Sequence, residues 1–85
     1  MSEEEKRRLT AKEAAEVAAK YLAELSSLNR LDISIEEIEL SSDENYWSIT
    51  LGHPRSYFGP AKEYKVIKVD AETGEVLSMK MRIVE

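Results

Sequence analysis

The spacing of apolar residues changes once along this chain, from every third or fourth residue to every second residue. Between residues 10 and 28 the apolar positions recur at helical spacing and form one face. From residue 33 onward they alternate with polar residues, which is typical of strands that bury one side. This change predicts a single α+β domain, in which one N-terminal helix packs on a four-stranded antiparallel sheet.

A capping box marks the start of the predicted helix. Thr10 is followed three residues later by Glu13, so the hydroxyl and the carboxylate can each accept a hydrogen bond from a free backbone N–H of the first turn. Serine and asparagine residues mark the end of the helix near residue 28. Residues 1–9 lack apolar periodicity and are expected to form a flexible leader before the domain of residues 10–85.

Four strands are expected to follow as a meander, in which each strand pairs with the next one along the chain. The first strand is irregular, because Ile35 and Ile38 are three residues apart and a regular strand would turn them to opposite faces. Either a bulge at Glu36 and Glu37 restores the common facing, or the strand begins near Ile35. The expected strands cover residues 33–40, 46–51, 64–69 and 76–84.

The connections between these strands are rich in turn-forming residues. Residues 41–45 are polar and form the first turn. Residues 52–61 contain both prolines and two of the three glycines, and they form the longest loop. A tight hairpin joins the last two strands, in which Gly74 takes a positive φ and the Asp70 carboxylate accepts hydrogen bonds from the turn N–H groups.

The alternation gives the sheet two different faces. The helix is expected to cover the apolar face, because only that face offers enough large side chains for a core. It carries Trp47, Ile49, Leu51, Ile67, Val69, Leu77, Met79, Met81 and Ile83. The opposite face is expected to meet solvent, and it carries Tyr46, Ser48, Thr50, Tyr64, Val66, Lys68, Ser78, Lys80 and Arg82.

The composition excludes several kinds of site. The chain has no cysteine, which excludes disulfides, thiolate metal sites and cysteine nucleophiles. His53 is the single histidine, so a metal site built from several histidines is also excluded. Because His53 precedes Pro54, we expect a loop histidine in an extended dipeptide rather than an acid–base group. We therefore expect no enzyme, no cofactor and no bound metal.

Acidic residues cluster at the first strand. Glu36, Glu37 and Glu39 lie within it, and Asp43 and Glu44 follow in the turn. Oxygen-rich clusters bind Ca²⁺ or Mg²⁺, but this run lacks the Asp-x-Asp-x-Asp-Gly loop that makes such a site specific. We expect a solvated strand edge whose charges discourage pairing with another sheet.

The chain shows no membrane or export segment. No stretch approaches the ~20 consecutive apolar residues of a membrane span. The first eight residues are mostly charged, and no apolar segment typical of a secretory signal follows them. The sequence therefore predicts a cytoplasmic protein without membrane insertion, with a trimmed secreted protein as the alternative.

Residues 69–77 read Val-Asp-Ala-Glu-Thr-Gly-Glu-Val-Leu. This stretch resembles the closing hairpin of PepSY-like domains, in which Val-Asp-Ala-x-Thr-Gly-x-Val-Leu is typical, and the order of the upstream elements extends the resemblance to about residues 11–85. The resemblance implies a cystatin-like fold, with a helix on a curved sheet, and an inhibitory or regulatory binding role without catalytic residues. The chain departs from the family in its proline- and aromatic-rich loop and in having no visible export signal or anchor.

Two surfaces are candidates for binding a partner. The first is the loop of residues 53–60, in which Arg55, Tyr57 and Phe58 are residue types enriched in binding hot spots. An alternative for Tyr57 and Phe58 is that they tuck under the sheet edge and close the core.

The second candidate surface is the solvent-facing side of the sheet. Its cations and aromatic side chains are Tyr46, Tyr64, Lys68, Lys80 and Arg82. Such a mixture also resembles a surface for single-stranded nucleic acid, but the net charge of −5 is opposite to that of most nucleic-acid-binding domains. One interpretation is an ordinary amphipathic face that only meets solvent. The other is a surface for a protein partner or for a second copy of the chain, and nucleic acid is not expected.

The sequence thus predicts a small protein-binding or regulatory module that uses the loop and the solvent-facing side of the sheet. Two alternatives stay open. One is a structural homodimer that pairs face to face. The other is a small-ligand-binding domain with a pocket between helix and sheet, lined by Tyr21, Trp47, Met79 or Met81.

Overall fold

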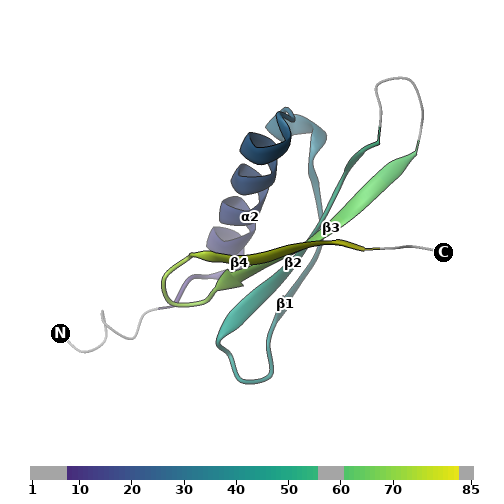
Figure 1. Cartoon of the computed structure of the whole chain (residues 1–85). Helices are drawn as coiled ribbons and strands as arrows, with labels where there is room; N and C mark the ends of the chain where they lie inside the picture. The colour runs from purple at the N-terminus through teal and green to yellow at the C-terminus, as the bar shows by residue number, and fades with distance from the viewer. Residues whose placement is uncertain (1–7, 56–60, 83–85) are drawn as a thin grey trace.

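The structure is a computed structural model that describes residues 8–55 and 61–82. One helix packs on a four-stranded antiparallel sheet with the strand order β1-β2-β3-β4, which confirms the predicted α+β architecture (Figure 1). The elements in chain order are α2 (Ala11–Ser26), a 3₁₀ turn η1 (Arg30–Asp32), β1 (Ser34–Leu40), β2 (Tyr46–Pro54), β3 (Lys62–Asp70) and β4 (Val76–Arg82).

Both ends of α2 are fixed by local hydrogen bonds. The Thr10 hydroxyl accepts from the Glu13 N–H at 3.1 Å, and the Glu13 carboxylate accepts from the Thr10 N–H at 2.9 Å, which confirms the capping box. The helix ends at Ser26, slightly earlier than expected. Ser27 takes the left-handed conformation with φ 56° and donates its N–H to the Ala23 carbonyl.

A bulge in β1 resolves the irregular spacing of its isoleucines. Ile35 lies opposite Leu51 and Ile38 lies opposite Ile49, with a register shift between Ile35 and Glu37. Glu36 is the extra residue, so both isoleucines lie on the side of the sheet that α2 covers. The bulge interpretation is confirmed, and the strand begins at Ser34.

Strands β2 and β3 extend further than the sequence predicted. Their ladder continues through Gly52 opposite Tyr64, His53 opposite Glu63 and Pro54 opposite Lys62. Glycine and proline are typical of loops, but here they end a strand. A Cβ at position 52 would lie 2.8 Å from the Glu36 carboxylate and 3.2 Å from the Tyr64 ring, so a larger residue here would displace these side chains.

A second bulge changes which residues of β4 reach the core. Val69 pairs with Val76 while Lys68 pairs with Ser78, so Leu77 is the extra residue. Leu77 is 50% exposed, whereas Val76 packs against the core, so the expectation that Leu77 contributes to the core was wrong. Met81 is also largely exposed, at 58%, rather than part of the core. Ile83 lies outside the described residues.

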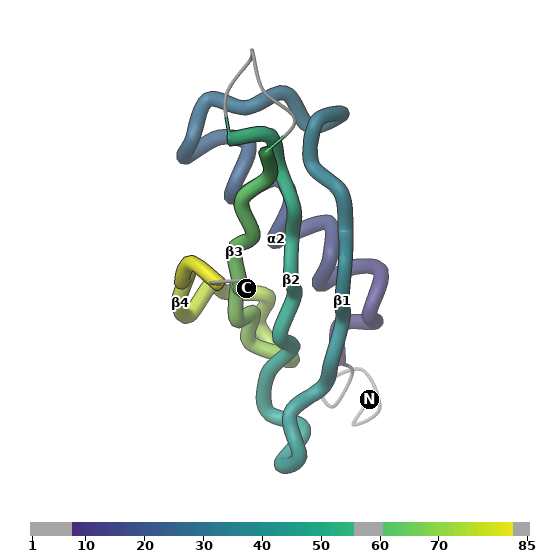
Figure 2. Tube along the Cα trace, turned by 90° about the vertical axis from the view of Figure 1, so that its right-hand side faces the viewer, coloured from purple at the N-terminus to yellow at the C-terminus, as the bar shows by residue number. Residues whose placement is uncertain are grey.

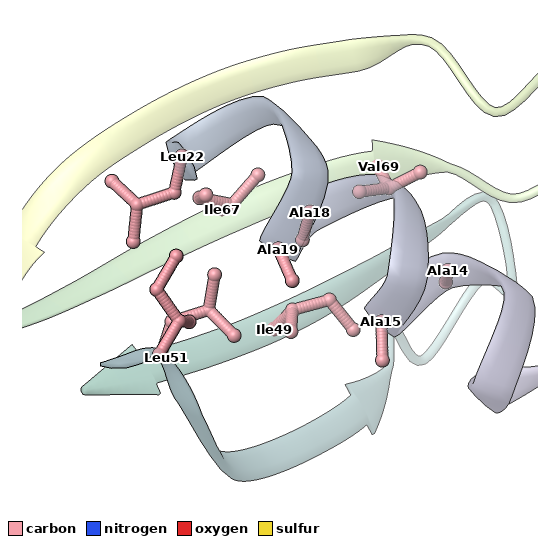
Figure 3. Packing of buried hydrophobic residues seen from close by; sticks show 10 residues of the cluster. Ala14, Ala15, Ala18, Ala19, Leu22, Ile49, Leu51, Ile67 and Val69 are labelled. Carbon is pink, nitrogen blue, oxygen red and sulfur yellow. The ribbon is translucent and has the colours of Figure 1, made fainter. Parts of the chain in front are cut away.

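The core is built from small helix residues and large sheet residues. The alanines of α2 let the helix approach the sheet closely, and the aliphatic side chains of β2 and β3 fill the space beneath it. Figure 3 shows these side chains pointing toward one another. The residues of this helix–sheet cluster with no exposed surface are Ala14, Ala18, Ala19 and Leu22 on α2, with Ile49, Leu51, Ile67 and Val69 on the sheet.

The folded domain begins before the predicted helix. The Leu9 N–H donates to the Ala71 carbonyl at 2.7 Å, and the Trp47 indole N–H donates to the Leu9 carbonyl at 3.1 Å. Arg8 pairs with Glu44 at 2.9 Å. Arg8 and Leu9, which the sequence assigns to the flexible leader, therefore belong to the domain.

Candidate protein-binding face

We use the name outer face for the side of the sheet opposite α2, which is turned toward the viewer in Figure 2. Neither α2 nor η1 covers this side (Figures 1 and 2). Directly opposite residues of antiparallel strands share a face, so the observed register assigns the side chains to it. The predicted site residues on the outer face are Tyr46, Tyr64, Lys68, Lys80 and Arg82.

Two of these residues are in direct contact. The Lys68 ammonium lies 4.7 Å from the centroid of the Tyr46 ring, which is a cation–π distance. The two residues are diagonal neighbours on β2 and β3, because Tyr46 pairs with Asp70 and Lys68 pairs with Ser48. Strand pairing therefore positions one aromatic–cation pair on the outer face.

An ion pair joins the two edges of the sheet. Arg82 on β4 donates from Nη1 to the Glu37 carboxylate on β1 at 2.8 Å. Strands lie about 4.8 Å apart, so β1 and β4 would be separated by about 14 Å in a flat sheet. The sheet must curl toward its outer face to allow this contact, and Figure 2 shows β4 turned out of line with its neighbours.

Thr50 is buried although it lies on the outer face. Thr50 lies on the outer face of β2, directly opposite both Glu37 and Val66, yet it is only 5% exposed. The Glu37–Arg82 pair spans the sheet beside it. The middle of the outer face is therefore partly covered by the protein's own side chains.

Two of the three acids of β1, Glu36 and Glu37, form ion pairs with basic residues. Glu36 lies 3.6 Å from the Lys62 ammonium and accepts a hydrogen bond of 2.6 Å from the Ser34 hydroxyl. That hydrogen bond, followed by the charge of Lys62, lowers the pKa of Glu36. Within residues 8–55 and 61–82, no group of three or more His, Cys, Asp or Glu residues has a geometry that could hold a metal ion.

Lys80 differs from the other cations of the outer face. Lys62 and Arg82 pair with acids of β1, and Lys68 lies over Tyr46. Lys80 is exposed, and none of the described residues forms a hydrogen bond or an ion pair with it. Its ammonium group is therefore available to a partner.

The predicted site residues of the loop are not placed on the outer face by the structure. The Arg55 guanidinium lies 3.8 Å from the carboxylate of Glu63, which faces the same side of the sheet as α2. Arg55 therefore does not join the cations of the outer face. Tyr57 and Phe58 lie outside the described residues, and their role in binding stays a prediction.

A polar cluster on the α2 side of the sheet was not predicted. The Lys65 ammonium lies 3.1 Å from Nε2 of His53 and 3.1 Å from the Glu63 carboxylate. Nδ1 of His53 lies 2.9 Å from the Pro54 carbonyl, which can only accept, so Nδ1 carries the proton and Nε2 accepts from Lys65. His53 is 7% exposed within β2, so the expectation of a loop histidine was wrong.

The sequence contains a signal for this cluster. The alternation of Trp47, Ile49 and Leu51 continues to His53, and the alternation of Val69 and Ile67 continues to Lys65. Extending the two strands past the last apolar residue would have predicted both side chains on the face of α2. The side chains of His53, Glu63 and Lys65 are hydrogen-bonded within the cluster, which lies beyond the last apolar residues of β2 and β3.

Acid should destabilise the fold through Glu63 and Asp70. The hydrogen bond and charge of Lys65 lower the pKa of Glu63 below 4.5, and the Thr73 and Glu72 backbone N–H groups lower that of Asp70 below 3.8. A carboxyl group whose pKa is lower in the folded chain than in the unfolded chain stabilises the fold at pH values above its unfolded-state pKa. This stabilisation is lost as the pH falls through the folded-state pKa. Thermal unfolding followed by circular dichroism should show a constant midpoint near neutral pH and a falling midpoint below about pH 4.5.

The variant Asp70→Asn separates the contribution of this residue. It should lower the midpoint at neutral pH and make the acid dependence shallower, because an uncharged amide does not titrate. An acid dependence as steep as that of the wild type would contradict the role given to the Asp70 carboxylate.

No family model, curated protein or solved structure matches this chain. At 16 residues, α2 is too short to cross a membrane, and the described residues contain no other helix that could.

Proposed function

We propose that this chain is a non-enzymatic protein-binding module whose contact surface is the outer face. The observation that supports it is the gathering of Tyr46, Tyr64, Lys68 and Lys80 on a sheet face that no helix covers. Aromatic side chains supply contact area at low entropic cost, and cations favour carboxylates. The partner is a protein segment that carries acidic and aromatic or aliphatic side chains.

The charge distribution favours a protein over nucleic acid. Glu37 and Glu39 lie on the same outer face, opposite Thr50 and Ser48. A phosphate backbone laid across this face would meet these carboxylates, and the whole chain has a net charge of −5. A folded protein segment can place its acids against β3 and β4 and its basic or neutral residues against β1.

The arrangement gives less support to an enzyme or a small-ligand carrier. Both ring nitrogens of His53 are hydrogen-bonded, and its side chain is buried. Of the residues expected to line a pocket, Trp47 and Met79 pack against the core, whereas Tyr21 and Met81 are 37% and 58% exposed. These four side chains therefore do not surround a common cavity.

The regulatory or inhibitory role implied by the resemblance to PepSY-like domains belongs to the proposal of a protein-binding module.

Selection from a library of random peptides tests this function. We expect the intact protein to enrich peptides that combine Asp or Glu with aromatic residues, because these complement Lys68, Lys80 and the two tyrosines. In a titration with a selected peptide, the double variant Lys68→Glu, Lys80→Glu should bind about tenfold more weakly or worse. Amide shifts in the NMR spectrum should map to β3 and β4.

A matched variant on the helix serves as the control. Lys12→Glu with Lys20→Glu makes the same change in charge on the exposed side of α2 and should leave the affinity unchanged. Equal losses of affinity in both double variants would mean that the net charge of the protein, and not the outer face, determines binding. Stronger binding of a single-stranded oligonucleotide than of any selected peptide would favour the nucleic-acid alternative.

A further inference from the structure

One cation of the outer face is occupied by an acid of the protein itself. Arg82 on β4 donates from Nη1 to Oε1 of Glu37 on β1, with 2.8 Å between the two atoms. Glu37 shares its row of directly opposite residues with Lys80, and Arg82 lies two positions further along β4. Because β1 and β4 are the two edges of the sheet (Figure 2), the ion pair crosses the surface on which a partner would lie.

This ion pair is exposed and uses only part of the Arg82 guanidinium. The side chains of Arg82 and Glu37 are 46% and 66% exposed. An exposed ion pair is weak, equivalent to about a fivefold change in an equilibrium constant at most. Among the described residues, Glu37 is contacted by Nη1 alone, whereas a guanidinium can hold a carboxylate through two parallel N–H donors. A carboxylate that uses both donors therefore competes effectively with Glu37.

We propose that Glu37 is an internal competitor at the outer face, which holds Arg82 in the free protein and is displaced by a carboxylate of the bound partner. The proposal rests on the function proposed above, because it requires an acidic protein segment at this face. Arg82 then joins Lys68 and Lys80 as a third cation for the acids of the partner. A segment that lacks an acid in reach of Arg82 leaves the ion pair closed, so Arg82 contributes only to the recognition of acidic segments.

Substitution of Glu37 tests the competition, with Glu39 as the matched control. The probe is an acidic peptide without Lys or Arg, selected on the intact protein and titrated by calorimetry. Glu37→Gln should raise the affinity about three- to fivefold, because Arg82 no longer has to leave Glu37. Glu39→Gln removes the same charge from the same strand and face, but none of the described residues forms an ion pair with Glu39. It should raise the affinity by less than about twofold.

A double-mutant cycle with Arg82 separates the ion pair from the change in charge. In the Arg82→Gln background, Glu37→Gln should change the affinity no more than Glu39→Gln does, because no guanidinium is released. A peptide in which every Asp and Glu is replaced by Asn and Gln should bind the wild type and Glu37→Gln equally. All three substituted positions are exposed, so circular dichroism should show an unchanged fold.

The outcomes separate this proposal from the function on which it rests. If Lys68→Glu with Lys80→Glu weakens binding but Glu37→Gln gains no more than Glu39→Gln, the outer face binds the peptide and Glu37 is not a competitor. A gain that persists in the Arg82→Gln background would also overturn the competition. If the double lysine variant binds as the wild type does, or if no peptide is selected, the function proposed for the outer face fails and this inference fails with it.

Discussion

Replacing Leu22 by alanine should destabilise the domain by about 2–5 kcal/mol. Leu22 is the one large residue of α2 with no exposed surface, and it lies in the same cluster as Leu51 and Ile67 (Figure 3). The shorter side chain removes buried apolar area and leaves a cavity that a small core cannot close. A domain of this size has a total stability of roughly 5–15 kcal/mol, so the loss takes a large share of it. Urea unfolding followed by Trp47 fluorescence measures the change.

The variant Leu31→Ala is the matched control for this prediction. Leu31 is 89% exposed, so the same chemical change should alter the free energy of unfolding by less than about 0.5 kcal/mol. Similar losses in the two variants would mean that α2 does not pack on the sheet as described.

Enlarging Ala18 to leucine should also destabilise the domain, by about 1–3 kcal/mol. Ala18 has no exposed surface and belongs to the same buried cluster as Ile67 and Val69. Close approach of the helix leaves no room for a larger side chain, so α2 must shift or the neighbouring residues must leave their preferred rotamers. Urea unfolding and the near-ultraviolet circular dichroism of Trp47 report the loss of stability and the change in packing.

Lys20→Leu controls for the effect of adding a leucine to the helix. Position 20 is exposed, and both residues favour a helix, so the free energy of unfolding should change little. If Ala18→Leu instead stabilised the domain, the helix would be standing further from the sheet than the structure shows.

Features that depend on neighbouring residues could be predicted from the sequence. The capping box of Thr10 and Glu13 forms as expected, because all of its hydrogen bonds lie within one turn. The turn after β3 also forms as expected, with Asp70 accepting from two N–H groups and Gly74 at φ 78°. The alternation of side chains within strands was sufficient to assign the described site residues of the sheet to the outer face.

Features that depend on pairing between strands were missed or left open. Leu77 was assigned to the core because regular alternation places it there, but the register of β3 with β4 makes it the bulged residue. His53 was assigned to a loop because glycine and proline flank it, but pairing with Glu63 extends the strand through it.

The spacing of apolar residues along the chain is enough to determine one helix, four strands and the two faces of the sheet, because each helix or strand has its own side-chain period. Only the tertiary structure decided where the bulges fall, that His53 contacts Lys65, and that Arg82 reaches Glu37 across the sheet. These contacts join residues that are far apart in sequence, and they depend on register and curvature, which no local pattern of side chains specifies.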